Sequence, residues 1–297
     1  MIIKNLMLEV TRKCNLQCEH CLRGDAQDKS MTSDVMVSLF QHISHIEMLT
    51  IGGGEPSLAI DVINNIHQCL VQANVTIGDV FLVTNGKDLS YPLLKAFNNL
   101  YGLVENHELS GFAISNDTFH KQERGFYRHP CDYQDMIDYP FDLDDLEDDK
   151  YIELELYNLN QHDFKINEHT SEKSNNWWPR GRAKGKSFAN HKDEPYLDCL
   201  VLDDIKHPTT IMGQMYVCYN GDVVGDMNMA YEDIPNYLRG NVKNWSNLIK
   251  ELEKSTIQNY KWCKQNCNYF DDCWDTWNNV SLETIEHCEI NKELFTE

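Results

Sequence analysis

Three closely spaced cysteines are the residues of this sequence with the clearest capacity for chemistry. Cys14, Cys18 and Cys21 stand in the segment TRKCNLQCEHC, in a C-x3-C-x2-C spacing. Three thiolates on one short loop can hold three corners of a four-iron cluster and leave the fourth iron open to another molecule. A structural zinc site is the alternative, because zinc takes four ligands and His20 can supply the fourth.

A glycine-rich segment follows at the end of the next expected strand. Met48 to Ile51 has the character of a strand, and Gly52 to Gly54, Glu55 and Pro56 come directly after it. One helix and one strand are expected between the cysteines and these glycines. Together and in this order, the cysteine loop and the segment GGEP resemble the radical S-adenosylmethionine (radical SAM) superfamily.

The resemblance implies a reaction in which the cofactors carry the difficult step. SAM would bind the open iron of a [4Fe-4S] cluster held by the three cysteines. One electron would then cleave its sulfonium C–S bond, and the 5′-deoxyadenosyl radical would abstract hydrogen from a substrate carbon. Gly53 and Gly54 would let the backbone approach the methionine part of SAM, and Glu55 would accept a hydrogen bond from its ammonium group. His20 would touch the adenine.

Two further strand ends resemble elements of the same superfamily. Thr84-Asn85-Gly86 is similar to its TNG element, which makes Asn85 a candidate SAM contact. Ser115-Asn116-Asp117 is similar to its S-x-D element, which implies that Ser115 and Asp117 face the ribose and methionine of SAM. Ordinary turn chemistry at a strand end is the alternative for both segments.

Arginines complete the site that the resemblance implies. Arg124 and Arg128 lie where relatives place an arginine that binds the SAM carboxylate, and we take Arg128 as the candidate. Thr118 stands where the glycine of that element is usual. The segment PRGRA around Arg182 is similar to a G-R-A element, which implies a place for Arg182 at the rim of the active site. A surface arginine is the alternative.

The C-terminal third holds a second group of cysteines. Asn220-Gly221 between β-prone residues predicts a hairpin, which places Cys218 on an arm facing Cys199. Further along the chain, Gly240-Asn241-Val242 precedes the last four cysteines. The spacing of these cysteines is similar to that in the SPASM and twitch domains, which bind auxiliary iron–sulfur clusters. The candidate ligands are Cys199, Cys218, Cys263, Cys267, Cys273 and Cys288.

These six cysteines fall short of the seven in a full SPASM domain, and Trp277 stands where a further cysteine is expected. Two cubanes would need eight ligands, so we predict at least one auxiliary cluster. Two ligand sets are possible for this cluster. The first is Cys263, Cys267, Cys273 and Cys288. The second, which the chain length favours, is Cys199 and Cys218 with two of Cys263, Cys267 and Cys273.

Alternating strands and helices must position these residues. The patterns predict strands over 6–10, 48–51, 80–84 and 111–114, with helices over 34–46, 60–72 and 92–100 between them. Such alternation predicts a parallel sheet. The resemblance implies a partial (β/α)6 TIM-like barrel over residues 1–190, followed by a small α+β cluster-binding domain over 191–297. The motifs all fall at the carboxyl ends of strands, where such barrels hold their active sites.

The charge and the hydropathy of the chain limit the kinds of partner it can bind. The chain has 297 residues and a net charge of −21, which disfavours nucleic acid. The sequence has no run of about 18 apolar residues, the length that would span a membrane, and its first residues do not form a signal sequence. We therefore expect a cytoplasmic protein. Cytosolic thiols stay reduced, and the clustered cysteines are therefore expected to bind metal.

The substrate is the open part of the prediction. Relatives with SPASM or twitch domains modify residues of peptides and proteins, which we rank first, whereas others are small-molecule dehydrogenases of the sugar or aminocyclitol type. The implied reaction class is that of an oxidoreductase, with reduced flavodoxin or ferredoxin as electron donor. A hypothesis of another class is an iron–sulfur scaffold or electron-transfer protein that does not cleave SAM.

Overall fold

The computed structural model describes residues 1–88, 90–130, 132–133, 164–169, 179–189 and 200–266, and a mostly parallel sheet runs through them. The strand order is β5-β4-β3-β2-β1-β7-β8-β9, and β6 pairs with β7. The two ends of this order do not meet, so the sheet of the described residues is open. The strands are β1 (Ile2–Thr11), β2 (His45–Gly53), β3 (Thr76–Thr84), β4 (Gly111–Ser115), β5 (Lys165–His169), β6 (Val201–Leu202), β7 (Thr210–Val217), β8 (Asp222–Val224) and β9 (Gly240–Asn241).

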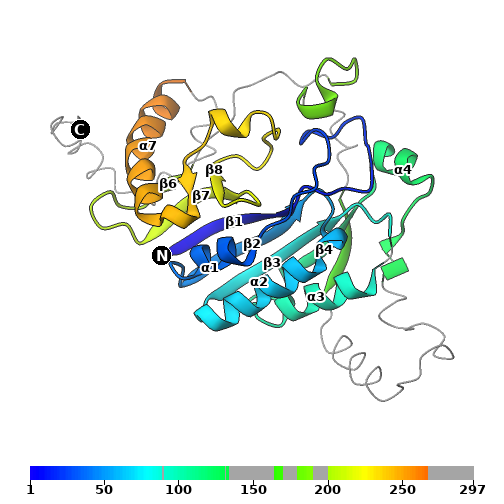
Figure 1. The fold of residues 1–297 in the computed structure, drawn as a ribbon, viewed down its shortest axis with the longest axis horizontal. Helices are drawn as coiled ribbons and strands as arrows, with labels where there is room; N and C mark the ends of the chain where they lie inside the picture. The colour runs from blue at the N-terminus through cyan, green and yellow to red at the C-terminus, as the bar shows by residue number, and fades with distance from the viewer. Residues whose placement is uncertain (89, 131, 134–163, 170–178, 190–199, 267–297) are drawn as a thin grey trace.

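Three helices cover one face of the parallel strands (Figure 1). Each turns an apolar side to the sheet, as α2 does by burying Ile63, Ile66 and Leu70 at helical spacing. A longer helix, α7, packs against β6 and β9 at the other end of the sheet. The α/β fold with a mostly parallel sheet is therefore confirmed. The helices are α1 (Ser33–Phe40), α2 (Ile60–Ala73), α3 (Tyr91–Tyr101), α4 (Thr118–Arg124) and α7 (Trp245–Asn266).

The predicted helix over residues 34–46 is too long. The helix α1 ends at Phe40, and Ile46 belongs to β2, where it is fully buried. The apolar spacing continues past the true helix end because the next strand buries Ile46 against the same core. Residues 151–156 also have the sequence pattern of a strand, and a run of acidic residues over 142–149 precedes them; both segments lie outside the described residues.

The strand β1 is central to the sheet. It pairs in parallel with β2 on one side and with β7 on the other, where Met7 lies opposite Tyr216. The N-terminal part and the part after residue 200 therefore share one sheet. The domain division predicted near residue 190 falls between described segments and stays a prediction. Within the described residues no helix is both long and apolar enough to cross a bilayer.

Candidate functional site

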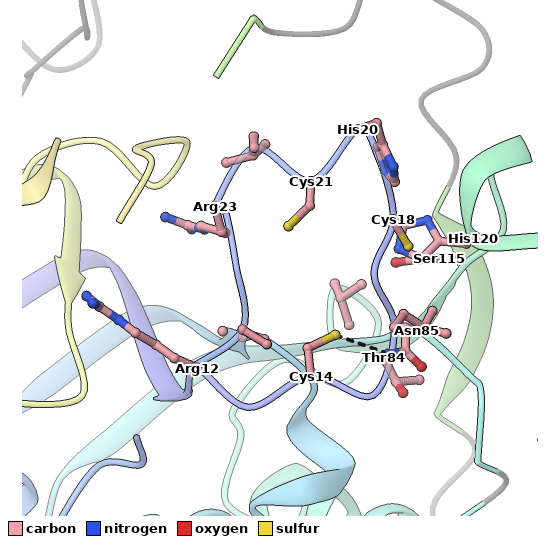
Figure 2. Close-up of a pocket in the computed structure, with 18 of the residues that line it drawn as sticks. Arg12, Cys14, Cys18, His20, Cys21, Arg23, Thr84, Asn85, Ser115 and His120 are labelled. Carbon is pink, nitrogen blue, oxygen red and sulfur yellow. Dashed lines mark hydrogen bonds between the residues drawn. The ribbon is translucent and has the colours of Figure 1, made fainter. Parts of the chain in front are cut away.

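A cavity of about 490 Å³ opens at the carboxyl ends of β1 to β4, and we name it the cysteine pocket. Figure 2 shows the loop after β1, which carries the three cysteines, curving around it. The ends of the next three strands form the wall beside this loop. Of the residues predicted for the site, those that line the pocket are Cys14, Cys18, His20, Cys21, Gly53, Gly54, Asn85, Ser115, Asp117 and Arg182.

Two of the three thiols, those of Cys14 and Cys18, need a bound cation to ionise. Burial raises the pKa of Cys14, and it raises the pKa of Cys18 to about 12. Without a bound cation both side chains therefore stay protonated at neutral pH, whereas metal binding deprotonates a thiol. Asn85 already donates a hydrogen bond from Nδ2 to Cys14 Sγ at 3.7 Å, which favours a negatively charged sulfur.

The glycines at the end of β2 make room for the start of the cysteine loop. Gly53 has a φ of 134°, and a Cβ added there would lie 2.2 Å from the Thr11 carbonyl oxygen. A Cβ on Gly54 would lie 2.1 Å from the Lys13 carbonyl oxygen. The backbone N–H of Gly54 donates to Thr11 O at 2.7 Å. These glycines thus hold the loop in place, and their contact with SAM stays a prediction.

Glu55 lies behind the pocket wall and is fully buried. Its Oε1 accepts from Thr84 Oγ1 at 2.6 Å and from the Ser57 backbone N–H at 3.0 Å, and its Oε2 accepts from the Asn85 backbone N–H at 2.7 Å. Burial raises the pKa of Glu55, and these hydrogen bonds oppose the rise. The carboxylate therefore ties β2 to the end of β3, and its predicted bond to the SAM ammonium stays a prediction.

Glu55→Ala is expected to lower the free energy of unfolding by roughly 3–5 kcal/mol, because it leaves buried donors on Thr84 and Asn85 without an acceptor. Urea unfolding measures the loss. Glu108→Ala, which removes an exposed carboxylate, is the control and is expected to stay within about 0.5 kcal/mol of the wild type. Equal midpoints for the two variants would contradict the tie between the strands.

Two histidines share the carboxylate of Asp117 beside Cys18. His120 Nδ1 lies 2.7 Å from Asp117 Oδ2, and His20 Nε2 lies 3.3 Å from the same oxygen. Burial works against the charge of Asp117, but its hydrogen bonds to the two imidazoles lower its pKa well below the usual range. His20 also stacks on Phe119 with ring centroids 4.7 Å apart. His120 is not among the residues predicted from the sequence, although its spacing three residues after a helix N-cap, Asp117, is a usable signal.

Arg124 and Arg128 both bind carbonyl groups at the strand ends. Arg124 is buried and donates from Nη1 to the carbonyl oxygens of Asn85 and Ser115. Arg128 donates from Nε to Gly86 O at 3.0 Å and lies outside the lining of the pocket. Both side chains thus hold strand ends together, and the predicted role of Arg128 toward the SAM carboxylate stays a prediction.

Arg182 lies against the cysteine loop from a distant part of the sequence. Its backbone N–H donates to Cys21 O at 2.9 Å. Burial works against the charge of the guanidinium, but a hydrogen bond to the Cys21 side chain raises the pKa of Arg182. Its buried Nε has no hydrogen-bond partner within the described part of the chain. Gly181, with a φ of 53°, allows the approach, since a Cβ there would lie 2.6 Å from Cys21 O.

The second cysteine group is described only in part. Cys218 is fully buried just after β7, where its backbone N–H donates to Asp222 O within the predicted hairpin. It packs in a cluster with Tyr216, Val224 and Met229. Cys263 lies on α7. The remaining candidates lie outside the described residues, so the auxiliary cluster stays a prediction; they are Cys199, Cys267, Cys273 and Cys288.

Comparisons with known proteins give one curated relative and several solved structures. No protein-family model matches the chain. It is 30% identical over 99 residues to a GTP 3′,8-cyclase of Lactiplantibacillus plantarum, a stretch that covers 30% of this chain and 29% of the relative. The similarity thus spans less than a third of that enzyme's length.

Two solved structures share little sequence with the chain. Native anSMEcpe with bound AdoMet and the Cp18Cys peptide is 13% identical, with a TM-score of 0.48 over 98% of this chain and all of that one. SuiB of Streptococcus suis bound to the precursor peptide SuiA is also 13% identical, with a TM-score of 0.33 over 76% of this chain and 60% of that one.

Proposed function

We propose that this chain is a radical SAM enzyme. The observation that carries the proposal is the convergence of Cys14, Cys18 and Cys21 on one cavity at the carboxyl edge of a parallel sheet. Parallel α/β sheets bind ligands at this edge. The sequence motifs for the cysteine loop and for three strand ends meet in this one pocket. The local similarity to GTP 3′,8-cyclase is consistent with the proposal.

The pocket fits a [4Fe-4S] cluster with SAM. Its volume of about 490 Å³ lies in the range of ligand cavities. The thiols of Cys14 and Cys18 require a cation to ionise, and the buried Nε of Arg182 lies beside Cys21 without a described partner. When bound, the cluster and SAM supply a 5′-deoxyadenosyl radical.

The chain's own residues would position these groups. The three cysteines would hold the cluster, and Asn85 and Arg182 would donate to its sulfur ligands. Ser115, Asp117 and His20 also line the pocket and would face SAM there. The orphaned Arg182 donor gains a partner when the pocket is filled, which adds to binding because an unsatisfied buried donor costs about 1–3 kcal/mol.

The decisive experiment is SAM cleavage. Protein reconstituted anaerobically with iron and sulfide is expected to convert SAM to 5′-deoxyadenosine when dithionite is added, without any substrate. Chromatography of the quenched reaction measures the product. No 5′-deoxyadenosine above a protein-free control would contradict the proposal and favour an iron–sulfur scaffold or electron-transfer protein.

The substrate that we propose first is a residue of a peptide or protein, with an oxidative change at carbon and reduced flavodoxin or ferredoxin as electron donor. A small-molecule dehydrogenase is the second candidate. The named substrate of the curated relative, GTP, is a small molecule and belongs to that second candidate. Incubation with candidate peptides, followed by mass spectrometry for a loss of two hydrogens, separates the two.

The auxiliary cluster gives a prediction that can be counted. The reconstituted protein is expected to hold more than four irons per chain, because the three N-terminal cysteines account for one cubane. Cys218→Ala is then expected to lower the count toward four while the first cluster stays. Iron and sulfide analysis measures both. A wild-type count of four would contradict an auxiliary cluster and return these cysteines to zinc or to free thiols.

A mononuclear metal site is a second candidate, on a separate observation. Ligand atoms of Cys18, His20 and His120 all lie within 4.8 Å of one another. Cysteine and histidine are the usual ligands of zinc. Protein isolated with one zinc per chain, and unable to take up iron and sulfide, would favour this candidate over the radical SAM enzyme.

A further inference from the structure

The cysteine pocket has a second end with a different chemical character. Arg12, Arg23 and Tyr231 line it together with Met227 and Asn228. Figure 2 shows Arg12 and Arg23 extending to one side of the cysteine loop, whereas Asn85, Ser115 and His120 lie on the other. We name the first side the guanidinium end. It is formed by residues that no radical SAM motif in this sequence includes.

Aromatic rings hold the two guanidinium groups in place. The Cζ atom of Arg12 lies 4.2 Å from the ring centre of Tyr231 and 4.8 Å from that of Tyr219. The Cζ atom of Arg23 lies 4.5 Å from the ring centre of Tyr216. Arg23 also donates from Nη1 to Met229 O at 2.9 Å. These contacts orient the planar groups without neutralising their charge.

The guanidinium end keeps an uncompensated positive charge. Glu9, fully buried beneath it and outside the pocket lining, accepts from Arg12 Nε at 2.7 Å and from the Tyr216 hydroxyl at 2.5 Å. The charge of Glu9 also attracts Arg23, although within the described residues Arg23 forms no ion pair. One carboxylate thus faces two guanidinium groups, which leaves one positive charge in excess.

The balance of charge along the pocket is opposite to that of the chain. Among the described lining residues Asp117 is the one carboxylate, against the three guanidinium groups of Arg12, Arg23 and Arg182. The chain as a whole has 47 acidic and 26 basic side chains. A cationic pocket in an acidic protein concentrates anions locally, and its field selects for them over neutral molecules.

Arg23, a half-buried guanidinium with no ion pair among the described residues, is suited to bind an anion. Removing a charge from water costs free energy unless another group pairs with it. The planar fork of arginine matches carboxylate and phosphate oxygens with two parallel hydrogen bonds. Arg23, which uses one described donor on Met229, has further N–H groups for such a ligand.

We propose that Arg12, Arg23 and Tyr231 bind an anionic group of the substrate, a carboxylate or a phosphate, at the guanidinium end of the cysteine pocket. The inference rests on the proposed function and deepens it. The substrate then lies between the anion contact and the groups that hold SAM, which fixes the position of its reacting carbon. Neutral sugars and neutral peptide segments are excluded from the preferred substrates.

The test is anion binding by the reconstituted protein, without SAM and with saturating SAM, in anaerobic calorimetry. The probes are pyrophosphate for a phosphate group and glutarate for a carboxylate. At least one is expected to bind, and Arg23→Gln is expected to weaken that binding at least tenfold. Arg239→Gln, which removes the same charge outside the pocket, is the matched control and is expected to change it less than twofold. Arg23→Lys is expected to restore part of the binding.

The outcomes separate the sources of the anion. Preference for pyrophosphate assigns a phosphate-bearing substrate, and preference for glutarate assigns a carboxylate such as an acidic side chain. Binding of neither probe, equal loss in Arg23→Gln and Arg239→Gln, or binding that SAM abolishes would overturn the proposal. The last result would assign the guanidinium end to the carboxylate of SAM itself.

A measurement on the wild type covers the case in which Arg23→Gln does not fold. Phenylglyoxal modifies accessible arginines, and peptide mass spectrometry reports which ones. The bound probe is expected to protect Arg23 but not Arg239, and absence of that protection overturns the proposal. The wild-type assay for 5′-deoxyadenosine is independent of both measurements. Anion binding without SAM cleavage would therefore contradict the proposed function, and cleavage without anion binding only this inference.

Discussion

Replacing Cys14, Cys18 and Cys21 together by alanine is expected to abolish SAM cleavage and to remove about four irons per chain from the reconstituted protein. The physical reason is that, among the described lining residues, these three thiols supply all the cysteine sulfur of the pocket. Circular dichroism is expected to stay close to that of the wild type, because the cysteines lie on a loop outside the sheet. Product chromatography and iron analysis give the two readouts.

A single cysteine elsewhere provides the control for this variant. Cys69 lies on α2, outside the pocket, and Cys69→Ala is expected to keep both the iron and the SAM cleavage. Retained cleavage in the triple variant would remove the cysteine loop from the active site. Loss of cleavage in Cys69→Ala without unfolding would show that the assay responds to any lost thiol.

Gly53→Ala is expected to lower the free energy of unfolding by roughly 3–6 kcal/mol. A methyl group there would lie 2.2 Å from the Thr11 carbonyl oxygen, and the backbone has a φ of 134°. Both β1 and β2 lie inside the sheet, so neither strand can move away without breaking hydrogen bonds. Urea unfolding measures the loss, and iron uptake is expected to fall with it because the cysteine loop begins at Thr11.

Gly125→Ala separates the clash from the backbone strain. Gly125 also has a positive φ, 81°, but nothing lies within 4 Å of an added Cβ. This variant is expected to cost only about 1–2 kcal/mol, the usual penalty for a left-handed residue. Equal losses for Gly53→Ala and Gly125→Ala would mean that strain alone, and not the contact with Thr11, makes glycine necessary after β2.

Local patterns were enough to predict the parallel strands β1 to β4 and the place of the cysteine loop, but they missed the parallel strand β5. The end of the predicted strand at Thr84 and the start of the predicted helix at Ile60 agree with β3 and α2, because apolar periodicity and turn residues are short-range signals, although β3 begins earlier, at Thr76. Asn85 and Ser115 meet in one pocket since the ends of neighbouring parallel strands share an edge. The motifs at the strand ends therefore predicted which residues lie close together in the structure.

Partners far apart in the sequence could not be predicted in this way. The pairing of β1 with β7, and the stacking of Arg12 on Tyr231, depend on tertiary packing that leaves no periodic trace near either residue. The motif containing Glu55 predicts the presence of a carboxylate but not the groups that donate hydrogen bonds to it. In the structure its oxygens are used by Ser57, Thr84 and Asn85, which is a matter of burial.

The place of β1 between β2 and β7 has a consequence for the order of events during synthesis. The strand β7 pairs with β1 and includes Tyr216, which lies opposite Met7. Tyr216 leaves the ribosome roughly 200 residues after Met7. At about 5–20 residues per second this interval lasts roughly 10–40 s. During this interval one edge of β1 has no strand partner, and the cysteine loop follows a strand whose sheet is still incomplete. Insertion of the proposed cluster into a complete pocket would therefore follow the synthesis of β7, and until then the free edge of β1 and the three thiols of the loop would be exposed.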